Sequence, residues 1–217
     1  MSLSLTTNGD SHLLGTLLAP AWRLRCSLSD DPFCWALAAD FLEDGVANRL
    51  AQSFPMTSFR IAGGGAPGYR FRYRTLISRS KVIVDDLPLI WRELAEAFTS
   101  AEYRRLLGGL VGCETDDLGV HAALCVYERG CWLSPHTDRE MRVVTQVVYL
   151  NREWDSAWGG SLRLLRSDRM EDVAAEVIPA FNSSVVFRRA QNSWHAVAPL
   201  ATGVDRSRRS LLLQLTH

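Results

Sequence analysis

Residues 120–150 read VHAALCVYERGCWLSPHTDREMRVVTQVVYL, and this stretch decides how the chain folds. Two apolar, partly alternating runs, 120–128 and 142–150, predict two β-strands. A turn, Arg129-Gly130-Cys131, follows the first run. Between the two strands lies Ser134-Pro135-His136-Thr137-Asp138, where a histidine and an aspartate stand one residue apart. This segment is where we expect the chemistry of the protein.

Short runs of the same kind continue to the end of the chain. The predicted strands are 161–166, 174–178, 183–189, 195–198 and 209–216. Turn residues separate them, among them Asn151, Gly159, Gly160, Asn182 and Pro199. Many short strands at this spacing predict a β-sandwich or β-barrel.

The first half of the chain has a different pattern. Helical apolar spacing predicts helices over 41–54, 89–98 and 100–110, with strands at 21–28 and 69–74. Pro32 is placed to open a helix, and residues 1–20 are expected to be a loose arm. The predicted fold is mainly β with N-terminal helices (α+β). No linker or internal repeat divides the chain, so we expect one domain over 1–217, with helix-rich support at 21–119 and a β core at 120–217.

Composition excludes several classes of protein. With 47% hydrophobic residues, 24 basic and 24 acidic residues, the chain has zero net charge, which argues against a nucleic-acid-binding or membrane-surface protein. The N-terminus is a poor secretory signal, and no apolar run is long enough to span a membrane. The five cysteines are odd in number and contain no C-x-x-C pair, so they are interpreted as reduced thiols of a cytoplasmic protein.

A metal site is the sharpest hypothesis for residues 134–138. His136 and Asp138 can present an imidazole nitrogen and a carboxylate oxygen to one cation, and His195 is the best candidate for a third ligand. Two histidines and a carboxylate that leave open positions form the facial arrangement of non-haem Fe(II) oxygenases. An H-x-D tripeptide alone is common, and a single histidine is more often a surface or hydrogen-bonded residue than a ligand.

The motifs together resemble the Fe(II)/2-oxoglutarate-dependent dioxygenases, in particular the prolyl-4-hydroxylase-like branch. The resemblance covers roughly residues 120–217. The segments that carry it are Tyr127-Glu128-Arg129-Gly130 ahead of His136, the strand Thr145–Asn151, Trp154-Asp155 followed by Gly159-Gly160, His195-Ala196-Val197, and Arg208-Arg209-Ser210-Leu211. Agreement in this order on predicted strands is far less common by chance than one motif.

The resemblance implies a double-stranded β-helix (jelly roll) and a hydroxylase that uses Fe(II), 2-oxoglutarate and O2 and releases succinate and CO2. It assigns His136, Asp138 and His195 to the metal. The cosubstrate residues that it implies are Arg208 and Tyr149 at the distal carboxylate, Tyr127 near the chelating end, and Ser210 in the same motif. Asp138 argues against a halogenase of this family.

One spacing departs from the family pattern. Arg208 lies thirteen positions after His195, a few more than is usual, and the loop 201–205 can absorb the difference. Arg206 and Arg209 are therefore rivals for the anchor role, and the R-x-S register favours Arg208. Strand periodicity offers a separate check if Tyr149 and Arg208 both face the interior of the barrel; the alternative is that Arg208 lies at the solvated start of its strand and pairs with nothing. A buried arginine needs an anion, and no acidic residue lies on the faces Val143–Tyr149 or Arg208–Gln214 that contain them.

The substrate stays open. We favour a small molecule, such as a free or carrier-tethered amino acid, with protein residues such as prolyl side chains as the alternative. A nucleic-acid demethylase ranks last, because the second arginine of that branch has no counterpart here. A non-catalytic jelly-roll binding protein is a further alternative. The sequence leaves the oligomeric state open.

The stretch 69–74 alternates aromatic and basic residues. In a strand Arg70, Arg72 and Arg74 would share one face. They are interpreted either as a solvated edge or as a site for an anionic group of the substrate, over which the glycine-rich loop 62–68 could close.

Overall fold

The computed structural model describes residues 8–22, 26–63 and 68–217. The helices are α1 (Asn8–Leu17), α2 (Asp44–Gln52), α3 (Leu89–Thr99) and α4 (Ala101–Val111), with a short 3₁₀ turn η2 (Ser156–Trp158). The strands are β1 (Cys26–Ser29), β2 (Trp35–Ala38), β3 (Arg60–Ala62), β4 (Tyr69–Ser78), β5 (Lys81–Val82), β6 (Gly119–Tyr127), β7 (Trp132–His136), β8 (Arg142–Tyr149), β9 (Leu162–Leu165), β10 (Val173–Val177), β11 (Ser184–Arg188), β12 (His195–Val197) and β13 (Arg208–Thr216).

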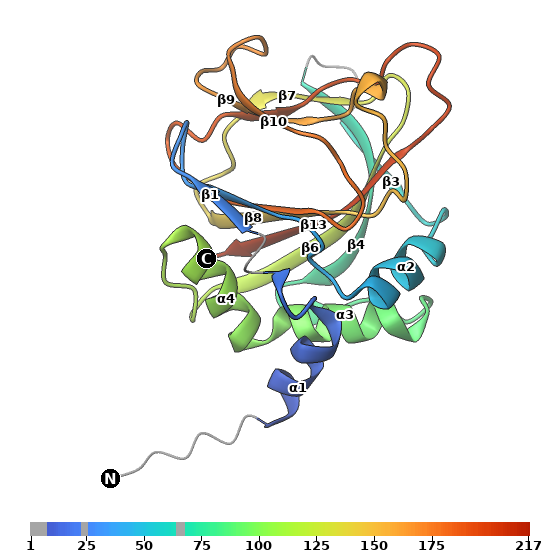
Figure 1. Cartoon of the computed structure of the whole chain (residues 1–217), viewed down its shortest axis with the longest axis vertical. Helices are drawn as coiled ribbons and strands as arrows, with labels where there is room; N and C mark the ends of the chain where they lie inside the picture. The colour runs from blue at the N-terminus through green and yellow to red at the C-terminus, as the bar shows by residue number, and fades with distance from the viewer. Residues whose placement is uncertain (1–7, 23–25, 64–67) are drawn as a thin grey trace.

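The strands form one strongly curled antiparallel sheet. Their order is β1-β2-β11-β8-β13-β6-β4-β7-β12-β9-β10, with β3 and β5 at the side of β4. The sheet folds over so that β7, β9 and β10 lie opposite β8, β13 and β6, while the helices cover the outer face of the β6–β8–β13 layer (Figure 1). This is a jelly roll backed by helices, which is the fold that the family resemblance implied.

Alternation along the central strands separates two cores. On β6 the residues Val120, Ala122, Leu124 and Val126 pack in the core shared with the helices, whereas Cys125 and Tyr127 face the inside of the jelly roll. Successive side chains of a strand point to opposite faces, so both faces of β6 are buried at once. The same alternation in β13 sends Leu211, Leu213 and Leu215 toward the helices, and leaves the alternate positions for the interior.

The helices have clear local causes. Ser100 accepts a hydrogen bond from the Tyr103 amide and begins α4, which ends at Gly112 in the left-handed conformation (φ 65°). Glu43 caps α2 in the same way through the Val46 amide. Within α4, Tyr103 is fully buried and donates a hydrogen bond of 2.6 Å to Gln146 of β8. The helical layer is therefore tied to the central sheet by a polar contact as well as by apolar packing.

Two expectations for the first half were wrong, and one strand of the second half was not expected. Residues 8–17 form α1, whose Leu14 and Leu17 are buried, so the expected loose arm is wrong for this part; residues 1–7 and 23–25 lie outside the described residues. Pro32 follows a cis peptide bond and leads into β2 rather than into a helix. The segment 132–136 is a strand, β7, which lacks a clear apolar alternation. Among the described residues, no helix combines the length and the apolar character that crossing a bilayer requires.

Candidate active site

The three candidate metal ligands converge at one end of the jelly roll. His136 ends β7 and His195 begins β12, and these two residues are direct partners in the antiparallel ladder. Their ring centroids lie 4.2 Å apart. One potential ligand atom from each of His136, Asp138 and His195 lies within 4.8 Å of the others. Residues separated by almost sixty positions in the chain thus form one cluster that could hold a metal ion.

The hydrogen bonds of the two histidines fix which nitrogen is available. Nδ1 of His136 lies 2.9 Å from the carbonyl of Ser134, and Nδ1 of His195 lies 2.9 Å from the carbonyl of Ser193. A carbonyl only accepts hydrogen bonds, so Nδ1 carries the proton and Nε2 keeps its lone pair. Burial and the neighbouring His136 lower the pKa of His195 to about 4, which keeps its ring neutral. Both features fit metal coordination.

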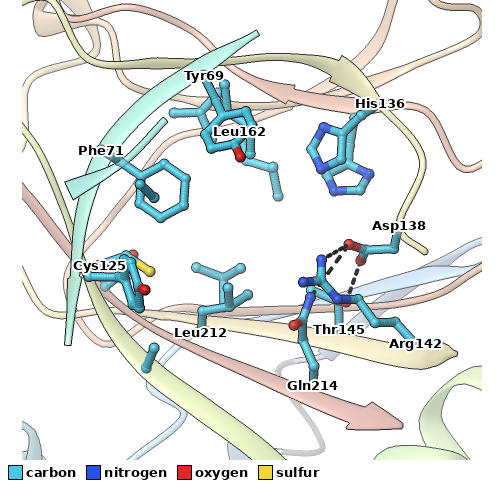
Figure 2. A pocket seen from close by; sticks show the side chains of 18 of the residues that line it. Tyr69, Phe71, Cys125, His136, Asp138, Arg142, Thr145, Leu162, Leu212 and Gln214 are labelled. Atoms are coloured by element: carbon cyan, nitrogen blue, oxygen red, sulfur yellow. Dashed lines mark hydrogen bonds and ion pairs between the residues drawn. The ribbon is translucent and has the colours of Figure 1, made fainter. Parts of the chain in front are cut away.

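Asp138 is held in place by three donors (Figure 2). Arg142 donates to Oδ1 at 2.8 Å, Thr145 donates to Oδ2 at 2.6 Å, and Gln214 lies 3.4 Å from Oδ1. The carboxylate is buried, with 4% of the residue exposed. Burial alone would raise the pKa of Asp138, but His195 and the hydrogen bonds from Thr145 and Arg142 outweigh it and lower the pKa. Asp138 is therefore an oriented carboxylate in its charged form.

Thr145→Val tests this support. The substitution keeps the shape of the side chain and removes the 2.6 Å hydrogen bond to Asp138. Because groups that orient a metal ligand typically contribute about 10–100-fold to metal affinity, we expect Mn(II) affinity to fall by roughly that factor. Calorimetric titration of the metal-free protein measures it. An unchanged affinity would show that Thr145 does not orient the carboxylate.

Arg208 lies on the floor of the same cavity. Only 2% of the residue is exposed, and its guanidinium is 5.0 Å from the ring centroids of both Tyr127 and Tyr149. Its hydrogen bonds are long, at 3.3 Å to the Ser210 hydroxyl and 3.4 Å to the Tyr149 hydroxyl. Among the described residues its Nε has no hydrogen-bond partner and its guanidinium has no carboxylate. A buried cation without an anion is costly, so this position is suited to a negatively charged ligand.

The two rival arginines point elsewhere. Arg209 lies on the opposite face of β13, with its guanidinium 5.6 Å from the ring centroid of Phe54. Arg206 is exposed and lies over the ring of Trp158 at 5.8 Å. Of these three arginines only Arg208 lines the cavity.

The Gly159-Gly160 pair of the sequence motif packs closely against Arg208 and leaves no room for larger side chains at either position. A Cβ on Gly159 would lie 2.4 Å from the carbonyl oxygen of Pro199, and one on Gly160 would lie 3.4 Å from Cδ of Arg208 and 3.1 Å from Trp154. Both glycines also have positive φ, 72° and 70°. Trp154 in turn donates a hydrogen bond of 3.0 Å to the carbonyl of Gly159. The motif is thus a tight turn that packs against the arginine stem.

The cavity has a volume of about 700 Å³ and runs along the inside of the jelly roll. Register defines its layers, because directly paired residues of neighbouring strands lie side by side. At the deep end Arg208 pairs with Tyr127, and Ser210 pairs with Cys125 and Tyr149. Nearer the metal cluster Leu212 pairs with Ala123 and Val147. The last layer is Gln214 with His121 and Thr145.

Strand β4 contributes its aromatic face to the cavity. Tyr69, Phe71 and Tyr73 line it, and Phe71 stacks on Tyr127 at 5.0 Å between ring centroids. Arg72 and Arg74 lie on the other face, where they form ion pairs with Glu128 and Asp86. None of the three arginines 70, 72 and 74 lines the cavity. The structure therefore does not bring them together with the other candidate residues, and the interpretation as a substrate site is corrected to that of an outer face. Residues 64–67 of the expected closing loop lie outside the described residues.

Several residues of the site were not singled out from the sequence. Thr145 and Gln214 lie on the strand faces that the alternation predicts to point inward, so their contact with Asp138 follows once β8 and β13 are known to pair with each other beside the metal cluster. Phe71 depends on pairing between distant strands and Arg142 on a turn that returns to Asp138 four residues earlier, and no local motif marks either residue.

This geometry defines a class of protein. A jelly roll holds two histidines and one carboxylate at one end of a cavity, and at the other end lies a buried arginine that forms no ion pair with any described residue. This is the arrangement of a non-haem Fe(II) oxygenase that takes an anionic cosubstrate.

Comparison with known proteins agrees. The sequence model of the 2OG-Fe(II) oxygenase superfamily matches residues 122–212, which include all three candidate ligands and Arg208. The part of the chain that contains the candidate site is therefore similar to the 2OG-Fe(II) oxygenases, a family of 2-oxoglutarate-dependent dioxygenases that uses Fe(II), 2-oxoglutarate and O2. No curated protein matches the sequence.

Solved structures share the fold at low sequence identity. A prolyl-4-hydroxylase of Pseudomonas putida is 22% identical over 84% of this chain and 92% of its own, with a TM-score of 0.62. A prolyl hydroxylase of Trichoplax adhaerens, in complex with a hypoxia inducible factor oxygen degradation domain peptide fragment, is 16% identical over 100% and 94%, with a TM-score of 0.63. A collagen prolyl hydroxylase of Paramecium Bursaria Chlorella virus-1 is 13% identical over 83% and 94%, with a TM-score of 0.55. The structural neighbours are thus prolyl-4-hydroxylase-like.

Proposed function

We propose that the protein hydroxylates a C–H bond of a small molecule, with His136, Asp138 and His195 as the metal ligands and Arg208 as the anchor of 2-oxoglutarate. The observation that carries this proposal is that one cavity contains both a set of candidate metal ligands and a buried arginine suited to an anion. At one end three oriented ligand atoms lie close enough to share a metal ion, and at the other end lies the buried guanidinium of Arg208, which forms no ion pair with a carboxylate of the described residues. Fe(II) and a dicarboxylate would satisfy both.

Each residue has a defined task in this proposal. The two histidines offer Nε2 because their Nδ1 protons are held by backbone carbonyls. The Arg208 guanidinium would bind the distal carboxylate, which the Tyr149 hydroxyl can also reach as a donor because burial raises the pKa of Tyr149 and keeps it protonated. Tyr127, Ser210 and Phe71 enclose the space between the anchor and the ligands. Bound Fe(II) with 2-oxoglutarate and O2 supplies the oxidising chemistry, and the co-products are succinate and CO2.

The inner walls restrict water around the cosubstrate. Cys125 and Leu212 lie on the floor between Arg208 and the ligand cluster, and burial raises the pKa of Cys125 to about 12, so its thiol stays neutral. An apolar, uncharged wall strengthens the attraction between Arg208 and a carboxylate, because little water competes for either group.

Cavity size favours a small molecule as the substrate. The volume of about 700 Å³ lies within the range of small-molecule sites, roughly 300–1,000 Å³. Hydroxylation of prolyl residues in a protein is the second candidate, and the prolyl hydroxylases among the structural neighbours support it.

The five cysteines are free thiols, which supports a reducing, cytoplasmic location. In this proposal the whole chain acts as a single catalytic domain.

A turnover screen tests the proposal. Purified protein with Fe(II), 2-oxoglutarate and O2 is offered free amino acids, carrier-bound acyl groups and proline-containing peptides, and succinate is measured together with the mass of each candidate. We expect one class to gain the mass of one oxygen atom in step with succinate. If peptides are hydroxylated and no small molecule is, the substrate is a protein residue rather than a small molecule. If no succinate forms in any reaction, with or without a candidate substrate, the proposed activity is contradicted.

A further inference from the structure

We propose that Arg142, assisted by Arg139, binds a carboxylate of the substrate at the end of the cavity that is lined by His121, Gln214 and Arg142, which we call the mouth. This inference rests on the proposed function and specifies its substrate class: a molecule whose carboxylate lies near the carbon that is oxidised.

The polar groups of the cavity lie in two separate places. Arg208 is at the deep end, in the layer with Tyr127. At the other end, beyond the ligand cluster, Gln214 pairs with His121, and Arg142 lies nearby on β8 beside Asp138 (Figure 2). Between them the floor is formed by Leu212 and its small or apolar neighbours. An anion at the mouth would thus be a different group from the one that Arg208 binds.

The charges that line the cavity are unbalanced. Of the described lining residues, Arg139, Arg142 and Arg208 are cationic, and Asp138 is the single acid. When the site is loaded, the two positive charges of Fe(II) equal the two negative charges of 2-oxoglutarate, and Asp138 offsets Arg208. The guanidinium groups of Arg139 and Arg142 then remain as excess positive charge at the mouth. A neutral substrate would leave this charge unused, whereas a carboxylate would meet it.

The guanidinium of Arg142 has N–H groups that are not used in its ion pair with Asp138. It uses one terminal nitrogen for Asp138, at 2.8 Å, and 33% of its side chain is exposed. Asp138 in turn has Thr145 and Gln214 as further donors, so it does not depend on Arg142 alone. A guanidinium carries five N–H groups in a planar fork and can hold a second carboxylate while it keeps the first.

Arg139 lies at the same edge of the mouth. The amide of Arg142 donates a hydrogen bond of 2.9 Å to the carbonyl of Arg139, which closes the turn between the Asp138 segment and β8. The Arg139 side chain is exposed, lines the cavity, and has no ion pair or hydrogen bond within the part of the chain that the structure describes. Two arginines on one tight turn make a local cationic pair.

The opposite wall is apolar. Tyr69, Leu133 and Leu162 line it, and Figure 2 shows Tyr69 and Leu162 across the cavity from Arg142 and Gln214. A substrate with a carboxylate at one end and an apolar body would match both walls at the same time. This polarity also distinguishes the candidates, because a prolyl residue inside a peptide has no carboxylate of its own.

Matched probes test the inference. Protein loaded with Mn(II) and 2-oxoglutarate, which occupies the deep site, is titrated with small apolar carboxylic acids and with their primary amides, for example L-leucine and L-leucinamide or hexanoate and hexanamide. Dissociation constants come from ligand-detected NMR. We expect the acids to bind about tenfold or more tightly than the amides, and Arg142→Gln to remove this preference. Arg139→Gln should reduce it by a smaller factor.

Controls separate this proposal from the proposed function. Arg92→Gln, which removes an exposed arginine paired with Asp85 on α3, should keep the preference for acids. The Mn(II) dissociation constant of each variant shows whether Asp138 still binds metal when Arg142 is absent. Equal affinity for acids and amides, failure of every acid to bind, or a preference that survives in Arg139→Gln/Arg142→Gln would overturn the carboxylate site. Succinate release by the same preparation bears on the oxygenase activity and not on this site.

A second series identifies the source of the carboxylate. Acetylated and amidated proline peptides that differ only in a neighbouring glutamate or glutamine are titrated under the same conditions. Binding of the free acids alone supports a small-molecule substrate. Preferential binding of the glutamate peptide with loss in Arg142→Gln would keep the carboxylate site and overturn the small-molecule class.

Discussion

The Asp138→Ala protein is expected to lose turnover almost completely, with a rate at least about 100-fold lower than that of the wild type. The carboxylate is one of three ligand atoms within 4.8 Å of one another, and removal of a direct ligand should cost more than removal of a group that merely orients it, which costs about 10–100-fold. Succinate release and iron content after dialysis measure the two consequences.

The fold should survive this substitution. Asp138 is surrounded by donors that have other options, because the Arg142 side chain is 33% exposed and can turn to water. We expect the free energy of unfolding of the metal-free protein to fall by no more than about 1–3 kcal/mol, the cost of leaving buried donors such as Thr145 without an acceptor. Asp85→Ala, which removes an exposed carboxylate beside Arg92, is the matched control. Wild-type hydroxylation by Asp138→Ala with iron supplied would contradict the assignment of the ligands.

His136→Ala and His195→Ala should remove turnover in the same way but differ in stability. His195 is buried and its ring packs 4.7 Å from that of Phe187, whereas His136 is half buried. Truncation of His195 therefore leaves a larger internal gap, so we expect the lower melting temperature for that variant.

The β half of the fold could be predicted because its signals are local. Alternation along 120–128 and 142–150 marks strands whose two faces are both buried, and turn residues mark where each strand ends. The segment 132–136 carries proline, serine and histidine and lacks such alternation, yet it forms β7 because β4 and β12 provide partners for its backbone. Pairing between distant segments overrides weak local preference here.

The candidate ligands were predictable for a similar reason, since a short motif and a recognisable order of motifs contain them. The walls of the cavity were not. The alternation in 69–74 correctly separates an aromatic face from a basic face, but only the position of β4 beside β6 and β7 decides which face turns inward. The aromatic face does so because Phe71 packs on Tyr127, while Arg72 and Arg74 form ion pairs with Glu128 and Asp86 on the outside.

Arg142 shows the same limit at the mouth. In the sequence it is the first residue of a predicted strand and one of several arginines in the stretch 139–142 and its surroundings. Its role depends on the return of the chain by four residues to Asp138 and on the absence of another acid among the described cavity residues. Both facts follow from the three-dimensional structure and could not be predicted from the sequence.

The second large effect is expected for Arg208→Ala, which should raise the KM for 2-oxoglutarate by a factor that corresponds to roughly 2–5 kcal/mol. Loss of a buried, charge-assisted contact leaves the distal carboxylate unpaired in an apolar pocket, and that is the magnitude of such a loss. Arg206→Ala and Arg209→Ala are the controls. Their side chains lie over Trp158 and Phe54 outside the cavity, so the KM should stay near the wild-type value. A large effect in either control with a mild one in Arg208→Ala would move the anchor to that residue.

Replacement of Arg208 should weaken the binding of 2-oxoglutarate but should not lower the melting temperature of the ligand-free protein. Arg208 is buried, with 2% exposed, and faces no carboxylate among the described residues, so the protein without cosubstrate bears an uncompensated cost of desolvation. Replacement of buried charged groups by apolar side chains of similar volume is often neutral or stabilising by about 1–4 kcal/mol. Arg208→Met should therefore melt at the same temperature as the wild type or higher when no ligand is present. Addition of Mn(II) and 2-oxoglutarate should raise the melting temperature of the wild type well above that of the variant, because Arg208 is the buried cation that would pair with the distal carboxylate. If Arg208→Met instead destabilises the ligand-free protein and still responds to 2-oxoglutarate, Arg208 is part of the packing of the jelly roll rather than a preformed anion site.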